Sequence, residues 1–136
     1  MNNRLWNIKN PYQTSAPKVL ALCSAGLLRS PTVANVLHEK LGCNTRAAGI
    51  TDYALIEVDM VLLEWADEIV CVEPSINALL GSFLHREADE ETVVKIMRKT
   101  TTLKIPDHYE WNDPKLREEI WYQYRNYGGK FWDDHK

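Results

Sequence analysis

The stretch that decides the fold is K-V-L-A-L-C-S-A-G-L-L-R-S-P-T-V-A-N-V-L, residues 18–37. It begins with an apolar run, 19–22, whose length and composition are typical of a strand buried in a parallel sheet. That strand ends at Cys23. After the Ser-Pro pair at 30–31, which has the chemistry of an N-cap and a first helical position, apolar residues recur at helical spacing. The stretch therefore predicts a strand, a loop that starts at a cysteine, and a helix over 31–41.

The predicted loop has the features of an anion-binding site, because free backbone N–H groups and the positive end of a helix dipole converge there. Those partial charges also stabilise a thiolate, so the Cys23 thiol should lose its proton easily. Arg29 can hold a tetrahedral oxyanion with two parallel hydrogen bonds, and Ser30 can donate its hydroxyl to the sulfur. Gly26 lets the backbone curl so that successive N–H groups point inward. We expect a nucleophile inside a phosphate cradle that is formed by Ser24, Ala25, Gly26, Leu27, Leu28, Arg29 and Ser30.

Length and composition indicate one globular domain, residues 18–136, preceded by an N-terminal arm, residues 1–17. The net charge of −3, without a basic block, favours neither nucleic acid nor a membrane as a partner. The three cysteines, at 23, 43 and 71, have no metal-ligand spacing and cannot form a closed disulfide set, which fits a reducing compartment. No signal-peptide pattern or membrane-spanning run is present. We expect a cytoplasmic protein without a metal or other cofactor.

Strand and helix patterns alternate along the rest of the chain, which predicts an α/β fold with an open parallel sheet and right-handed crossovers. Gly42 and Asp59 are suited to end one helix and to cap the next. The predicted strands span 18–23, 44–48, 69–72 and 101–105. The predicted helices span 31–41, 60–66, 74 to about 83, a segment around 93–97, and a final helix from about 113 to just before 128.

The segment C-S-A-G-L-L-R-S-P-T-V-A resembles the phosphate-binding loop of the low-molecular-weight protein tyrosine phosphatases, and is most similar to a small bacterial and phage branch. The similarity covers roughly residues 18–127. It continues through R-A-A-G-I (46–50), L-L-E-W-A-D-E-I-V-C-V-E (62–73) and L-K-I-P-D-H-Y-E-W-N-D-P-K-L (103–116). The resemblance implies a three-layer sandwich whose four-stranded parallel sheet has the order 2-1-3-4, with flavodoxin-like winding and helices on both faces. Where this chain has Ala25-Gly26, the family usually has Gly-Asn, and that Asn braces the loop.

Two aspartates could protonate the leaving group of a phosphate ester. Asp107 directly follows the fourth predicted strand, which places it at the same sheet edge as Cys23, and we predict that it is the general acid. Asp113 is the alternative, because the resembled family shows an Asp-Pro dipeptide at its acid. The same dipeptide is also typical of a helix start. Beside the acid lie candidate pocket-wall residues, which could instead pack the loop onto the body: His108, Tyr109 and Trp111.

The residues and the resemblance together predict a cysteine-dependent phosphomonoester hydrolase. Cys23 would form a cysteinyl-phosphate intermediate, Arg29 would hold the phosphate oxygens and Asp107 would protonate the leaving oxygen. The resemblance implies a phosphotyrosine protein as substrate, with small aryl or alkyl phosphates as further possibilities.

Three other readings stay open beside the hydrolase. The chain could be a catalytically weak module that binds phosphate or a phosphorylated ligand. It could be an arsenate reductase-like thiol enzyme, although residues 74–99 contain no resolving cysteine. It could also engage a partner through its aromatic arm and tail. A weak homodimer through the carboxyl-terminal aromatic residues is a further expectation.

Overall fold

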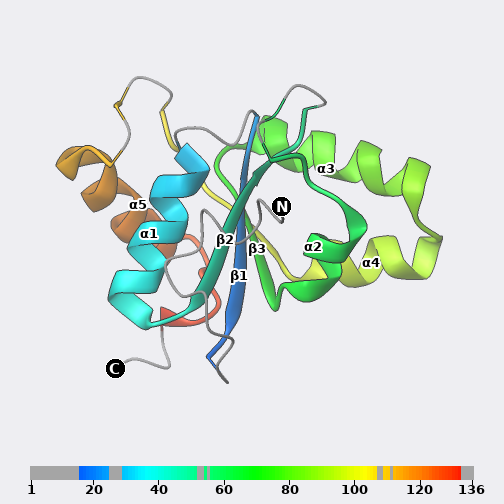
Figure 1. The fold of residues 1–136 in the computed structure, drawn as a ribbon, viewed down its shortest axis with the longest axis horizontal. Helices are drawn as coiled ribbons and strands as arrows, with labels where there is room; N and C mark the ends of the chain where they lie inside the picture. The colour runs from blue at the N-terminus through cyan, green and yellow to red at the C-terminus, as the bar shows by residue number, and fades with distance from the viewer. Residues whose placement is uncertain are drawn as a thin grey trace.

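The computed structural model describes residues 16–24, 29–51, 54, 56–106, 109–110 and 112–132. They form a parallel sheet between two layers of helices (Figure 1). The parallel sheet is the one that the alternating sequence patterns predicted, and its three layers are the arrangement that the family resemblance implied. Of the predicted N-terminal arm, residues 1–17, only 16 and 17 fall within the described ranges.

The sheet has the order β2-β1-β3-β4 with every pair of neighbours parallel, which confirms the predicted order 2-1-3-4. Cys23 pairs in register with Gly49 of β2, and Leu22 pairs with Cys71 of β3, so these three strands end at one edge of the sheet. Residues 19–22 of the central strand β1 are all fully buried, as their apolar composition predicted. The strands are β1 (Lys18–Cys23), β2 (Asn44–Gly49), β3 (Glu68–Cys71) and β4 (Thr100–Thr102).

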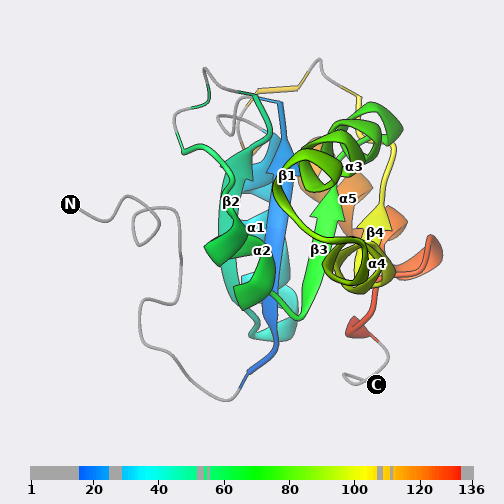
Figure 2. The same ribbon diagram turned by 90° about the vertical axis from the view of Figure 1, so that its right-hand side faces the viewer.

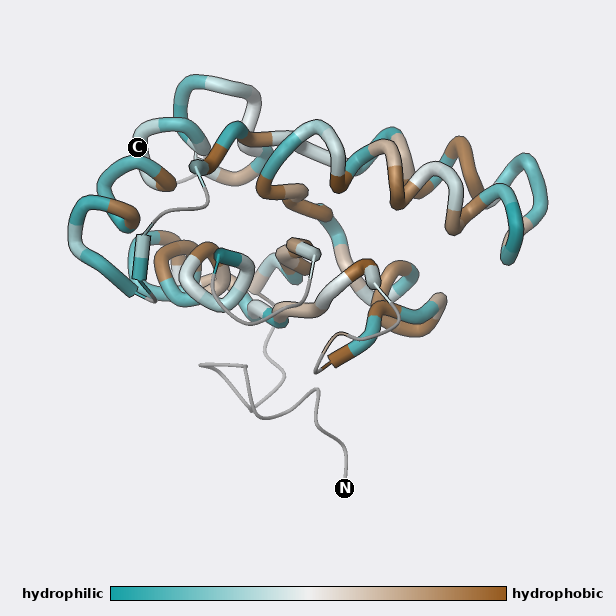
Figure 3. Tube along the Cα trace, turned by 90° about the horizontal axis from the view of Figure 1, so that it is seen from above, coloured by the Kyte–Doolittle hydropathy of each residue, from teal (hydrophilic) through white to brown (hydrophobic). Residues whose placement is uncertain are grey.

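The helices of the described residues cover the sheet on its two faces. They are α1 (Arg29–Leu41), α2 (Met60–Trp65), α3 (Pro74–Glu87), α4 (Glu90–Arg98) and α5 (Pro114–Asn126). Figure 1 shows α1 and α5 on one side of the sheet, and Figure 2 shows α2, α3 and α4 in front of the other. Polar and apolar residues alternate along these helices (Figure 3), as they must where one face packs on a sheet and the other meets water.

The largest errors in the predicted boundaries are in α1, α3 and β4. Helix α1 begins at Arg29, so Ser30 and Pro31 lie inside the helix and Ser30 is not its N-cap. Helix α3 continues to Glu87 instead of ending near residue 83, because the fully buried Leu84 extends its apolar stripe by another turn. Strand β4 ends at Thr102 rather than at 105.

A buried carboxylate lies at the amino end of β3. The Glu68 side chain is fully buried and accepts hydrogen bonds from the Tyr124 hydroxyl (2.6 Å), the Thr101 hydroxyl (2.7 Å) and the Lys130 backbone N–H (2.8 Å). The Tyr124 hydroxyl in turn accepts from the Phe131 N–H at 3.0 Å. Burial raises the pKa of Glu68, although these donors oppose the shift. The carboxylate thus ties the chain after α5 to the base of the sheet.

We predict that Tyr124→Phe lowers the free energy of unfolding by about 2 kcal/mol near neutral pH, because a buried carboxylate then loses a donor. The loss should shrink as the pH falls, since a raised pKa means that Glu68 takes up its proton in the folded state before it would in the unfolded chain. Urea unfolding at several pH values measures both effects. Tyr122→Phe, which alters an exposed ring on the same helix, is the control. A loss independent of pH would contradict the assignment of the bond to the ionised carboxyl.

Candidate active site at the carboxyl edge of the sheet

Cys23 is the last residue of β1, which lies between β2 and β3 in the sheet; the chain crosses from β1 to β2 on one side and then from β2 to β3 on the other side of β1. Ligands of open parallel sheets bind at such a change of direction, outside the carboxyl ends of the strands. The Cys23 carbonyl accepts from the Ile50 N–H at 3.0 Å, which joins the end of β1 to the segment after β2. The thiol-bearing residue is therefore fixed at the centre of this edge.

The Cys23 Sγ lies 3.1 Å from the Ser30 Oγ in a buried contact. The structure thus brings together the two groups that the sequence paired, although Ser30 does not cap the helix. Ser30 reaches the sulfur from the first turn of α1, and its Oγ also lies 3.4 Å from the Ala48 carbonyl on β2. A hydroxyl at this distance can donate to a thiolate and stabilise its charge.

The start of the predicted phosphate loop is held from β2. The Ser24 carbonyl accepts two hydrogen bonds from Thr51, one from its hydroxyl at 2.8 Å and one from its backbone N–H at 3.1 Å. The four following residues of the predicted cradle lie outside the described residues: Ala25, Gly26, Leu27 and Leu28. Arg29 and Ser30, the last two residues of the predicted cradle, are both buried.

Arg29 is 5% exposed, and its guanidinium joins three parts of the chain. Its Nη1 donates to Glu73 Oε2 at 2.5 Å and to the Ile105 carbonyl at 3.0 Å. Glu73 follows β3 and also accepts from the Ser75 hydroxyl. The Arg29 hydrogen bond, followed by that of Ser75, lowers the pKa of Glu73. Glu73 therefore keeps its negative charge opposite the guanidinium at pH values at which an ordinary glutamate would already be protonated.

Of the two candidates for the general acid, the structure describes only Asp113. Asp107, together with the pocket-wall candidates His108 and Trp111, lies outside the described residues. Asp113 is the N-cap of α5 and accepts from the Lys115 N–H at 2.8 Å, which is the structural role that its Asp-Pro dipeptide allowed. Tyr109, the remaining pocket-wall candidate, is half-buried and packs against the hydrophobic core.

Sequence reasoning missed two residues at this edge, Glu73 and Asn112. Glu73 directly follows an apolar strand and precedes Pro74, so the rule that placed Asp107 at the edge would also have found it. Asn112 has a positive φ of 59°, accepts from the Asn35 side chain at 3.0 Å and lies just before α5. The hydrogen-bond partners Arg29 of Glu73 and Asn35 of Asn112 lie many residues away, so no local pattern shows these pairings.

Cys43 and Cys71 are buried, as is Cys23. Burial raises the pKa of Cys43 and of Cys71 to about 12 in each case. In the part of the chain that the structure describes, no three Cys, His, Asp or Glu side chains are grouped so that they could hold a metal ion. Nor does any helix of those residues have the length and apolar character needed to cross a bilayer.

No protein-family profile and no curated protein matches the sequence. Solved structures do match the fold. The tyrosine phosphatase Wzb from Escherichia coli K30, in complex with phosphate, has a TM-score of 0.60 at 16% identity, over 85% of this chain and 98% of its own. The YwlE arginine phosphatase from Geobacillus stearothermophilus has a TM-score of 0.62 at 15% identity, over 88% and 96%.

SP-PTP, a low-molecular-weight protein tyrosine phosphatase from Streptococcus pyogenes, has a TM-score of 0.62 at 13% identity, over 88% of this chain and 98% of its own. At such identities the likeness establishes the fold, and it extends over nearly the full length of each solved chain. This chain therefore has the fold of the low-molecular-weight protein tyrosine phosphatases, as its sequence motifs implied.

Proposed function

We propose that this protein is a cysteine-dependent phosphomonoester hydrolase that acts through a cysteinyl-phosphate intermediate. The observation that carries the proposal is the buried contact of 3.1 Å between Cys23 Sγ and Ser30 Oγ at the end of the central strand. The Arg29 guanidinium, fixed by Glu73 and the Ile105 carbonyl, belongs to the same turn of α1 as Ser30. A thiol, a donor to that thiol and an oriented guanidinium at one sheet edge are the parts that phosphoryl transfer to sulfur requires.

In the first step the Cys23 thiolate attacks phosphorus in line, and an S–P bond forms as the bond from phosphorus to the leaving oxygen breaks. Arg29 and the backbone N–H groups of residues 24–29 hold the three equatorial oxygens. Asp107 gives its proton to the leaving oxygen. In the second step a water molecule attacks phosphorus and passes a proton to the Asp107 carboxylate. The S–P bond then breaks, and the electron pair returns to the sulfur, which the Ser30 hydroxyl stabilises.

The proposed substrate is a phosphotyrosine protein, and small aryl phosphates serve as its simplest analogues. Two of the solved proteins that share the fold are named as tyrosine phosphatases, and one is named as an arginine phosphatase. The fold thus accommodates different leaving groups. Tyr109, which is half-buried and follows the proposed acid by two positions in the sequence, would contribute an aromatic wall that favours an aryl group.

A second candidate is a module that binds phosphate without rapid turnover. It is favoured by the Ala25-Gly26 pair, which lacks the side chain that braces this loop in the resembled family. The arsenate reductase-like reading has less support. Cys43 and Cys71 are buried, and their raised pKa values leave little thiolate to resolve a reaction at Cys23.

The central test is a pH–rate profile for aryl phosphate hydrolysis by the wild type, Cys23→Ser, Asp107→Asn and Asp113→Asn. Cys23→Ser should abolish turnover while inorganic phosphate still binds. Asp107→Asn should lower the rate by about 10²-fold or more and remove the limb that reports the general acid. Asp113→Asn should keep that limb, because its carboxylate caps α5.

The outcomes separate the two candidates. Wild-type turnover that survives Cys23→Ser would refute the covalent mechanism. A wild type that binds phosphate or vanadate but turns over no aryl phosphate would favour the binding module. Loss of the acid limb in Asp113→Asn instead of Asp107→Asn would exchange the roles of the two aspartates.

We predict that Glu73→Ala lowers kcat/KM for aryl phosphate by about tenfold, because Arg29 loses a charged partner that orients it. Glu73→Gln keeps an acceptor oxygen and should recover most of the loss. Glu64→Ala, which removes an exposed carboxylate on α2, is the matched control. Steady-state kinetics measures all three variants. An undiminished kcat/KM in Glu73→Ala would contradict the orienting role of Glu73.

We also predict that iodoacetamide near neutral pH modifies Cys23 in the native protein and leaves Cys43 and Cys71 unmodified until the chain unfolds. A thiol whose pKa is raised to about 12 has almost no thiolate at that pH. Mass-spectrometric mapping of the modified peptides, with and without inorganic phosphate, measures the reaction. Phosphate should protect Cys23. Equal labelling of all three cysteines would contradict the assignment.

A further inference from the structure

We propose that Asn112 is a positioning residue, which anchors the segment that carries the general acid to helix α1. The inference rests on the proposed function, and it adds the hydrogen bonds that fix the position of the general acid relative to the nucleophile. Its residues lie outside the phosphate loop, and they join α1, α5 and the end of the segment between β4 and α5.

The backbone of Asn112 is in the left-handed region, with a φ of 59°. Among the described residues it is the one non-glycine residue with a positive φ. Such a conformation costs of the order of 1 kcal/mol and persists where the surroundings fix it. Here the Asn112 N–H donates to the Thr32 Oγ1 at 3.0 Å, and Thr32 is fully buried in the first turns of α1.

The side chain of Asn112 makes two more bonds through a single oxygen. Its Oδ1 accepts from the Asn35 Nδ2 on α1 at 3.0 Å and from the Arg117 Nη1 on α5 at 2.8 Å. Asn35 is 4% exposed, and Arg117 also forms an ion pair with Glu39 on α1. Both donors are N–H groups, so position 112 must supply an acceptor.

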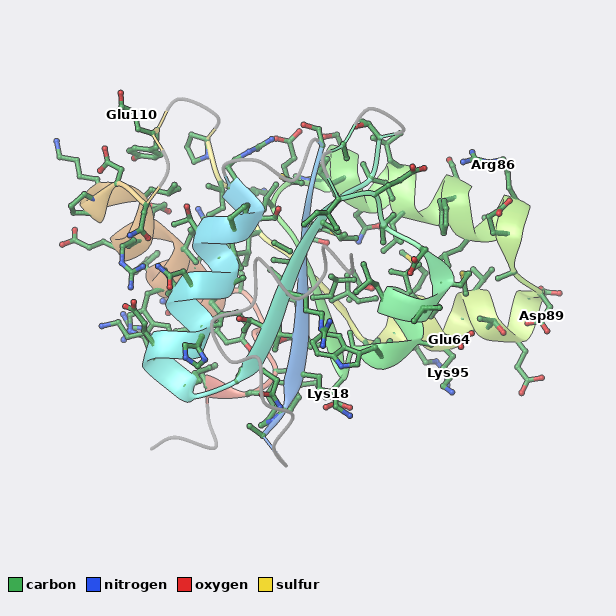
Figure 4. All side chains as sticks on the ribbon, in the orientation of Figure 1. Lys18, Glu64, Arg86, Asp89, Lys95 and Glu110 are labelled. Atoms are coloured by element: carbon green, nitrogen blue, oxygen red, sulfur yellow. The ribbon has the colours of Figure 1, made fainter. Side chains whose placement is uncertain are left out.

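The other end of the acid-bearing segment is fixed as well. The Ile105 N–H donates to the Val72 carbonyl at 2.8 Å, and the Ile105 carbonyl accepts from Arg29 at 3.0 Å. Ile105 and Asn112, the described residues that flank the acid-bearing segment in the sequence, are thus both held by side chains of α1. Glu110, within this segment, points away from the body of the molecule in Figure 4, so its side chain does not serve as a further anchor.

One helix thus carries both the guanidinium of Arg29 and the anchors of the segment that bears the proposed acid. The position of the acid relative to phosphorus then depends on the Asn112 bonds. A displacement of about 1 Å in a reacting group can lower a rate by about 10²-fold. Loss of the Asn112 bonds should therefore slow protonation of the leaving oxygen and leave the attack by sulfur unchanged.

The test compares Asn112→Gly, Asn112→Asp and the control Asn126→Ala on two substrates. Glycine accepts the positive φ but removes the acceptor, whereas aspartate keeps both the acceptor and the tolerance for this conformation. Asn126 is an exposed asparagine at the other end of α5. Phenyl phosphate needs a proton on its leaving oxygen, while 2,4-dinitrophenyl phosphate has a leaving group that departs without one.

We expect Asn112→Gly to lower kcat/KM for phenyl phosphate by about tenfold or more, and for 2,4-dinitrophenyl phosphate by less than about twofold. Asn112→Asp should recover most of the rate on phenyl phosphate, and Asn126→Ala should match the wild type on both substrates. Equal losses on the two substrates in Asn112→Gly would show a merely structural role and overturn the inference. So would an unchanged rate on phenyl phosphate.

The proposed function fails separately. If the wild type hydrolyses neither substrate, or if turnover survives Cys23→Ser, the hydrolase mechanism falls and the inference falls with it. If turnover depends on Cys23 but the losses in Asn112→Gly do not differ between substrates, only the anchoring role is overturned.

Discussion

The site depends on the hydrogen bonds of one buried guanidinium. Arg29 is 5% exposed, and a charge so placed must be paired and hydrogen-bonded. The structure meets this demand with the Glu73 carboxylate and the Ile105 carbonyl, which come from the segments that follow β3 and β4. The hydrogen bonds that stabilise the buried charge therefore also join the segments that follow β1, β3 and β4. They restrict movement of α1, β3 and β4 relative to Cys23.

The parallel sheet makes this convergence possible. In parallel strands every carboxyl end points to the same edge, so residues from distant parts of the sequence meet there without long loops. The Ser24 carbonyl accepts a hydrogen bond from Thr51, which follows β2. Arg29 donates to Glu73 and to Ile105, which lie 44 and 76 positions further along the chain. The opposite edge, at the amino ends of the strands, holds a different set of hydrogen bonds. There, Glu68 accepts from Tyr124, Thr101 and Lys130 and serves to fix the chain after α5.

The sequence predicted what apolar periodicity and turn chemistry control. Buried residues 19–22 define β1, Asp59 caps α2 as expected, and Gly42 closes α1 with a φ of 70°. Ser30 was paired with the right sulfur but given the wrong place in the helix, since a Ser-Pro pair fits an N-cap and also fits an interior first turn. Asn112 could not be found, because its role comes from contacts with Asn35 and Thr32, about 80 residues away in the chain.

Glu68 and Glu73 lie at the two ends of β3 and show how surroundings, and not residue type, decide ionisation. Burial dominates at Glu68 and raises its pKa, whereas the hydrogen bond from Arg29 dominates at Glu73 and lowers its pKa. As the pH falls, Glu68 therefore takes up its proton first, which relieves the cost of a buried charge and favours the folded state. Glu73 takes up its proton last, and only then does Arg29 lose its charged partner. Protonation of Glu68 and protonation of Glu73 thus have opposite effects on the bonds at the two ends of β3.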